Sequence, residues 1–132
     1  MTVRVDLIDG GAVVEIRASG QATRREAGWA TERARELCQR REVTAILADC
    51  SDAEQQNSPR LSAEIIENFL FALDRPIPTA YIVPHVWDES YRGAVHGEII
   101  ELPAHARFFT DRDSAVDWLA SRPKAPAALS QS

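Results

Sequence analysis

Cys50 and His85 are the two residues in this sequence with the clearest capacity for covalent chemistry. Cys50 lies in the run Asp49-Cys50-Ser51 after one predicted strand, and His85 follows the next predicted strand along the chain. The carboxyl ends of neighbouring parallel strands meet at one edge of a sheet, so both side chains are expected at the same rim. A thiol beside an imidazole is the smallest set of groups that makes a thiolate nucleophile.

The surroundings of Cys50 argue against catalysis. No glycine-rich loop that could form an oxyanion hole follows it, and the nearby Asp52 and Glu54 would raise the pKa of its thiol. The three histidines fall on different predicted elements, and the sequence has no HExxH motif and no paired cysteines. The sequence therefore predicts no catalytic residue, no metal site and no cofactor.

A binding role for this rim is the stronger interpretation. Aromatic residues at helical spacing usually pack in a core, but Trp87 and Tyr91 lie on a helix that Gly93 and Gly97 weaken, beside the rim. We therefore expect them to contact a ligand or a partner. The residues predicted to form this ligand or partner edge are Asp49, Cys50, Ser51, His85, Trp87 and Tyr91, and Thr110 and Asp111 follow the last strand at the same rim.

Composition excludes several classes of function. The chain has 132 residues, enough for one domain, and a formal net charge of −5 that disfavours nucleic acid or an anionic membrane surface as partner. It has neither an apolar run near the ~18 residues of a membrane span nor a signal-peptide core. We therefore expect a cytoplasmic protein in which Cys38 and Cys50 stay reduced.

The rim depends on alternating strands and helices, whose limits the sequence marks clearly. Asp9-Gly10-Gly11 supplies the positive φ of a tight hairpin turn, Thr23 begins a capping box, and Thr110 is positioned to cap the last helix. The expected elements are strands 3–7 and 14–18, helix 24–38, strand 43–48, helix 59–73, strand 79–83, helix 87–102, strand 106–109 and helix 111–119.

This order predicts an α/β domain over residues 1–121 and a flexible tail over residues 122–132. The domain should contain a mixed five-stranded sheet, with an N-terminal hairpin followed by βα units, and four helices. The hairpin leaves one strand at an edge, so self-association into a homodimer is a further expectation.

Two segments carry a resemblance to a known family. The exit from the hairpin, Ala18-Ser19-Gly20-Gln21-Ala22-Thr23, and the closing run 107–119 resemble the SpoIIAA-like family, which is grouped with STAS domains and the CRAL-TRIO fold. The likeness covers residues 3–121. It implies a domain without intrinsic chemistry, because STAS relatives bind protein partners or nucleotides and CRAL-TRIO relatives hold lipids.

We therefore expect a non-catalytic regulatory or protein-interaction module. The alternative is a protein that binds a small apolar ligand or lipid in a cleft at the carboxyl ends of the strands. The STAS switch carries an Asp-Ser-Ser-Gly-like motif, and the matching stretch here is Asn57-Ser58-Pro59-Arg60. The resemblance implies Ser58 as a candidate phosphoacceptor, whereas a serine before proline is also a routine helix start.

Overall fold

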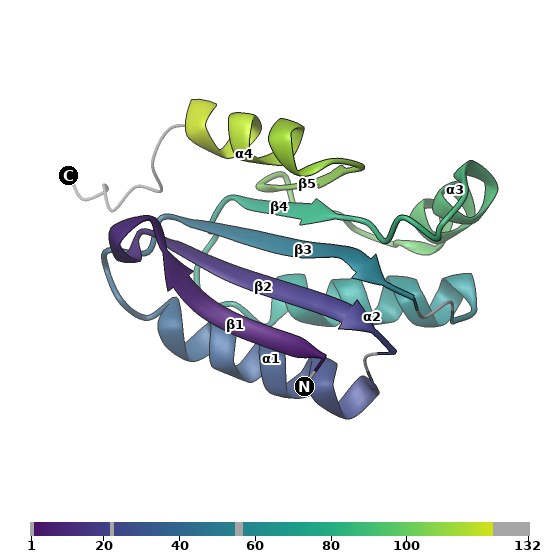
Figure 1. Ribbon diagram of the computed structural model, residues 1–132, viewed down its shortest axis with the longest axis horizontal. Coiled ribbons are helices and arrows are strands. Elements are labelled where there is room, and N and C mark those ends of the chain that lie inside the picture. The colour runs from purple at the N-terminus through teal and green to yellow at the C-terminus, as the bar shows by residue number, and fades with distance from the viewer. Residues whose placement is uncertain (1, 22, 55–56, 123–132) are drawn as a thin grey trace.

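Five strands form one mixed sheet in the computed structural model, which describes residues 2–21, 23–54 and 57–122 (Figure 1). The strands are β1 (Val3–Ile8), β2 (Val13–Gly20), β3 (Ala45–Ala53), β4 (Thr79–Ile82) and β5 (Ala106–Phe109), and the helices are α1 (Arg24–Leu37), α2 (Pro59–Phe71), α3 (Glu89–Glu98) and α4 (Arg112–Ser121). The strand order is β1-β2-β3-β4-β5, with β1 antiparallel to β2 and every other neighbouring pair parallel. The predicted α/β architecture is confirmed. Apart from Arg122, the predicted tail lies outside the described residues.

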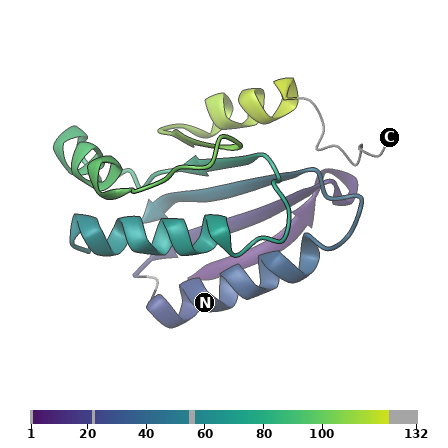
Figure 2. The same cartoon turned by 180° about the vertical axis from the view of Figure 1, so that it is seen from behind.

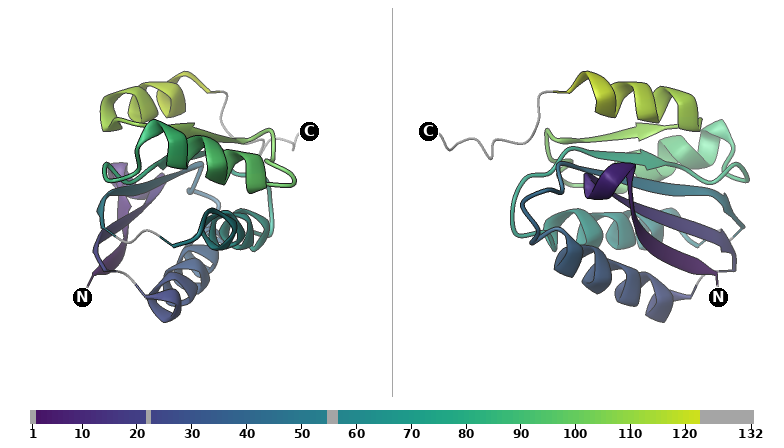
Figure 3. Two further views of the ribbon diagram at one scale, coloured as in Figure 1. Left: turned by 90° about the vertical axis from the view of Figure 1, so that its right-hand side faces the viewer. Right: turned by 60° about the vertical axis from the view of Figure 1, so that its left-hand side comes forward.

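The sheet is covered unequally on its two faces. Helices α1 and α2 lie on one face, and α4 lies on the other, above β3, β4 and β5 (Figures 2 and 3). The larger core lies beneath α1 and α2, where Val14, Ile46 and Ile66 are buried. The smaller core lies beneath α4 and contains Leu47 and Ile82. On the α4 side of the sheet, β2 contributes Val13, which packs against the smaller core, and Glu15, which bonds to Arg112 of α4, whereas β1 shows buried or half-buried residues alternating with exposed ones from Val3 to Asp6.

Local signals account for the turns and helix starts. The hairpin turn has positive φ at Asp9 (55°), Gly10 (68°) and Gly11 (95°), as the sequence predicts. The capping box of α1 also forms, because the Glu26 amide donates to Thr23 Oγ1 at 3.1 Å while the Thr23 amide donates to Glu26 Oε1 at 2.8 Å. Hydrogen bonds from Thr2 and then Thr23 lower the pKa of Glu26 to about 2.

The cap of α4 differs from the prediction by one residue. Asp111, not Thr110, is the N-cap, and its carboxylate accepts from the Ser114 amide at 2.8 Å and the Ser114 hydroxyl at 3.0 Å. A carboxylate satisfies both donors at once, which a threonine hydroxyl in its place would not do, and its charge suits the positive end of the helix. These bonds lower the pKa of Asp111 below its ordinary value.

Strand β3 is longer than predicted and contains a bulge. The sequence predicts a strand over 43–48 followed by a polar loop, but the strand runs from Ala45 to Ala53. Its pairing with β2 shifts register between Arg17 and Ser19, so the two residues Cys50 and Ser51 lie opposite one residue of β2. The bulge changes which face each later side chain of β3 points to.

Helix α3 is shorter than predicted. It begins after Asp88, whose carboxylate accepts from the Tyr91 amide at 2.7 Å, so Trp87 lies in the preceding turn. It ends at Glu98, and Leu102 lies beyond it. The apolar spacing that suggested a longer helix comes from residues that pack against the core from turns on either side.

We expect Gly93→Ala and Gly97→Ala each to stabilise the protein by about 0.5–1 kcal/mol, measured by chemical denaturation. A Cβ added at either position meets nothing within 4 Å, and neither glycine has a positive φ. Alanine therefore restricts the unfolded chain without a steric penalty in the helix. At Gly10, where φ is 68°, the same substitution is expected to destabilise the hairpin and is the matched control.

Candidate functional site

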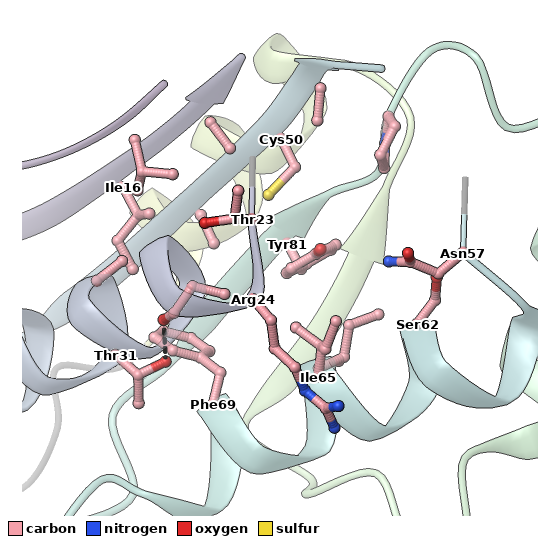
Figure 4. Close-up of a pocket in the computed structure, with 18 of the residues that line it drawn as sticks. Ile16, Thr23, Arg24, Thr31, Cys50, Asn57, Ser62, Ile65, Phe69 and Tyr81 are labelled. Carbon is pink, nitrogen blue, oxygen red and sulfur yellow. Dashed lines mark hydrogen bonds between the residues drawn. The ribbon is translucent and has the colours of Figure 1, made fainter. Parts of the chain in front are cut away.

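An apolar pocket of about 250 Å³ lies between α1, α2 and the sheet (Figure 4). It opens at the carboxyl ends of the parallel strands, and the first residues of α1 and α2 border it. Most of its lining is apolar. The apolar lining residues include Ile16, Ala30, Ala48, Leu61, Ile65 and Phe69.

Small side chains on three elements leave this space empty. Ala27 and Ala30 face it from α1, Ala48 and Ala53 from β3, and Ala18 from β2. Protein interiors are normally packed to the density of organic crystals, so alanines that meet around one volume leave a pocket unless larger residues elsewhere reach in. Of the predicted edge residues, Cys50 and Trp87 line this largely apolar cavity.

Two hydroxyl groups that line the pocket, those of Thr31 and Ser62, take part in hydrogen bonds within the protein. Thr31 Oγ1 donates to the Ala27 carbonyl at 2.9 Å, as the dashed line in Figure 4 marks. The Tyr91 hydroxyl donates to the Asn57 carbonyl, so the Ser62 hydroxyl donates its own proton to the Tyr91 oxygen at 2.8 Å. These bonds leave the pocket suited to an apolar rather than a strongly polar ligand.

Cys50 points into the pocket, which Tyr81 also lines. Burial is the main reason that the pKa of the Cys50 thiol rises to about 11, with a smaller contribution from Asp49. Burial also raises the pKa of Tyr81 well above its ordinary value. A thiol that is protonated at neutral pH is a poor nucleophile.

The rim brings the ends of β3 and β4 together, but it does not join Cys50 to His85. The His85 amide donates to the Ser51 carbonyl at 3.0 Å, which places the two chain segments side by side. The His85 side chain is exposed and does not belong to the pocket lining, whereas Cys50 faces inward. The structure does not assemble the predicted pair as a nucleophile and its base.

Asp49 faces away from the pocket, although it is next to Cys50 in the strand. Successive side chains of a strand point to opposite faces, so Asp49 lies beneath α4. There Arg112 donates to Asp49 Oδ2 at 2.8 Å and to Glu15 Oε2 at 2.5 Å. Ser51 adds bonds to Asp49 Oδ1 from its hydroxyl at 2.6 Å and its amide at 3.1 Å.

We call Arg112, Asp49 and Glu15 the ion cluster. Burial works to raise the pKa of Asp49, but hydrogen bonds from Ser51 and Arg112 outweigh burial and hold that pKa below its ordinary value. The same two carboxylates raise the pKa of Arg112 against the effect of burial. The cluster lies on the face opposite the pocket, so we assign it to stability rather than to ligand binding.

Of the two predicted aromatic residues, Trp87 lines the pocket, whereas Tyr91 lies behind the lining residue Ser62, to which it is hydrogen-bonded. Trp87 is part of its lining and packs edge-on against Tyr91, with ring centroids 4.9 Å apart. Ser58 is exposed and caps α2, where its hydroxyl accepts from the Leu61 amide at 3.2 Å. Its role as a phosphoacceptor stays a prediction.

Sequence reasoning missed two groups of residues at the site. The alanines of the pocket are one group, and the other is Arg24, which borders the pocket and pairs with Glu64 at 2.7 Å; none of them is among the residues predicted to form the ligand edge. Several alanines on predicted neighbouring elements were a usable signal, but only the packing shows that they face the same space.

Comparison with known proteins adds no assignment, since no protein-family model and no curated protein matches this sequence. No helix in the described part of the chain is long and apolar enough to cross a membrane. Within the same residues, no group of three or more histidine, cysteine, aspartate or glutamate side chains could hold a metal ion.

Proposed function

We propose that this protein is a non-catalytic binding module that holds a small apolar ligand in the pocket between α1 and α2. The observation that carries the proposal is the cavity of about 250 Å³ with its apolar, alanine-rich lining. A dry cavity of about 150 Å³ in another protein binds benzene, so this pocket suits a ligand somewhat larger than one aromatic ring. Typical pockets for larger ligands begin near 300 Å³.

The border of the pocket favours entry and release of such a ligand. The Arg24 side chain reaches from α1 toward α2 beside the pocket (Figure 4), and its ion pair with Glu64 joins the two helices at 2.7 Å. Both side chains are largely exposed, and exposed ion pairs typically contribute only about 0–1 kcal/mol. Opening this contact therefore costs little.

The element order supports the resemblance to the SpoIIAA-like family, which implies a domain that binds rather than catalyses. A regulatory role is the second candidate function, and the position of Ser58 favours it. Ser58 is exposed at the start of α2, next to Asn57, which lines the pocket. A phosphate there would add about −2 charge at a positive helix end beside the ligand.

We expect naphthol and octanoic acid each to bind saturably at one site in an NMR titration that observes the protein. The largest chemical-shift changes should fall on residues that line the pocket. Ala30→Leu should weaken binding about tenfold or more, because the added carbons occupy the space that the ligand needs. Ala27→Leu, at a half-buried position of the lining, is a second blocking variant in case the first perturbs the fold.

Ala120→Leu is the matched control. It adds the same side chain at an exposed position of α4, on the opposite face of the sheet. Binding by this control should equal that of the wild type. The proposal fails if neither compound gives saturable shifts, or if both pocket variants bind as well as the control.

A further inference from the structure

A second hollow, of about 500 Å³, lies between α3 and the start of α4, at the carboxyl ends of β4 and β5. Figure 1 shows α3 beyond the carboxyl ends of the strands and α4 with its first turn toward the same end. β5 is the last strand of the sheet, so side chains from both of its faces border a hollow at its open edge. The lining residues that matter here are Trp87, Arg92, His96, Arg107, Phe108 and Asp111.

The two arginines of this hollow lack acidic partners. Elsewhere in the protein Arg24 pairs with Glu64, and Arg60 with Glu98. Within the described part of the chain, neither Arg92 nor Arg107 forms an ion pair; Arg92 donates to the Trp87 carbonyl at 3.0 Å. The Arg107 guanidinium lies over the Phe109 ring, 5.6 Å from its centroid. Most of the donors of both guanidinium groups therefore remain available to a ligand.

Asp111, the acidic residue that lines the hollow, forms no ion pair with either of these arginines. Both carboxylate oxygens of Asp111 already accept hydrogen bonds from Ser114, at 2.8 and 3.0 Å. The same residues form the start of α4, whose positive helix end faces the hollow. His96 adds a third nitrogen-bearing side chain, and its ring lies edge-on to Phe108 with centroids 6.0 Å apart.

Trp87 adds a donor at the wall of the hollow. Its side chain is only 5% exposed, and its indole nitrogen has no hydrogen-bond partner among the described residues. An unsatisfied buried donor is costly, so its presence in a native wall calls for an acceptor. Trp87 also lines the apolar pocket, so it separates the two cavities.

We propose that the hollow between α3 and α4 is an anion-binding site that holds a carboxylate or phosphate group through Arg92 and Arg107. Planar guanidinium groups match both anions with paired hydrogen bonds. The site is separate from the apolar ligand of the proposed function and does not depend on it. The protein has a net charge of −5, so its overall field repels anions, and saturable anion binding must arise from this local arrangement.

The test uses Trp87 as the reporter. The sequence has three tryptophans, and the double substitution Trp29→Phe/Trp118→Phe leaves Trp87 alone. Its indole N–H then gives one NMR signal that needs no further assignment. We expect phosphate and benzoate, titrated against chloride at constant ionic strength, to move this signal saturably, with Kd on the order of 1 mM. Arg92→Gln/Arg107→Gln should weaken binding at least about tenfold.

Two controls separate this site from general charge effects. Arg33→Gln/Arg60→Gln removes the same charge from arginines outside the hollow and should leave the affinity unchanged. Asp111→Asn keeps a good helix cap while it removes the one acidic side chain among the described residues that line the hollow, and should tighten binding. The proposal is overturned if neither anion gives a saturable shift, or if both double-arginine variants bind equally. Naphthol binding in the first pocket should be unaffected by the loss of Arg92 and Arg107.

Discussion

Arg112→Met is expected to lower the free energy of unfolding by about 2–3 kcal/mol at neutral pH. Arg112 holds two carboxylates that are almost fully buried, since the side chains of Asp49 and Glu15 are only 4% and 9% exposed. Removing the cation leaves Glu15 without an ion pair among the described residues, and leaves Asp49 with Arg17 alone, 4.0 Å away. Loss of one member of a buried ion pair usually costs about 3–5 kcal/mol, and the lower value applies because Arg112 itself is 39% exposed, so water can partly replace it.

The pH dependence of this effect has a definite sign. The folded protein holds the pKa of Asp49 below its ordinary value of 3.8, so its ion pair stabilises the fold above that pH and loses its effect as the pH falls below it. In the variant, protonation of the buried Asp49 carboxylate as the pH falls relieves the cost of burying its charge. The difference in the free energy of unfolding between wild type and variant should therefore become smaller at acidic pH. Urea denaturation at a series of pH values measures it.

Arg60→Met is the matched control for Arg112→Met. Arg60 pairs with Glu98 at 3.7 Å with both side chains well exposed, so its loss should change stability by less than about 0.5 kcal/mol. Adding Glu15→Gln and Asp49→Asn to Arg112→Met should recover most of the lost stability, because no buried charge remains. Equal effects of Arg60→Met and Arg112→Met would contradict a structural role for the ion cluster.

Ala30→Leu and Ala34→Leu are expected to shift the melting temperature in opposite directions. The two alanines lie one turn apart on the same buried face of α1, so the change in helix propensity is the same. Ala30 borders the empty pocket, and filling such a cavity commonly adds about 0.5–2 kcal/mol. Ala34 is fully buried outside the pocket lining, where added carbons overpack the core at a cost of about 1–3 kcal/mol.

This pair tests whether the pocket is empty space without any knowledge of the ligand. Differential scanning calorimetry on the purified variants gives both shifts under identical conditions. If Ala30→Leu destabilises as much as Ala34→Leu, the pocket is not available for an added side chain, and the proposed function loses its main support.

Local chemistry made most of the fold predictable. Thr23, Ser58 and the Asp9-Gly10-Gly11 turn act through partners within a few residues, so their roles follow from spacing alone. The alternation of Val3 and Val5 with charged residues likewise predicts a strand with one covered face. The error at the cap of α4 was one residue, because Thr110 and Asp111 are both plausible caps and only the backbone decides between them.

The error in β3 has a non-local cause. Asp49 looks like the start of a loop because a charged residue inside a buried strand is normally too costly. The free-energy cost of burying the Asp49 charge is offset by its ion pair with Arg112, which lies 63 positions away in the chain. No spacing rule reveals such a partner, and the bulge at Cys50 and Ser51 depends in turn on the strand continuing past Asp49.

By itself, the sequence determined the number and order of the strands and helices, because period-two and helical patterns, caps and turns act over a few residues. Only the tertiary structure decided which side chains share a space. It separated Asp49 from Cys50 onto opposite faces of one strand, brought alanines of β2, β3 and α1 around one pocket, and placed Arg92 with Arg107 at one hollow. The reason is physical: these contacts join residues far apart in the chain, and packing of whole elements, rather than local preference, sets them.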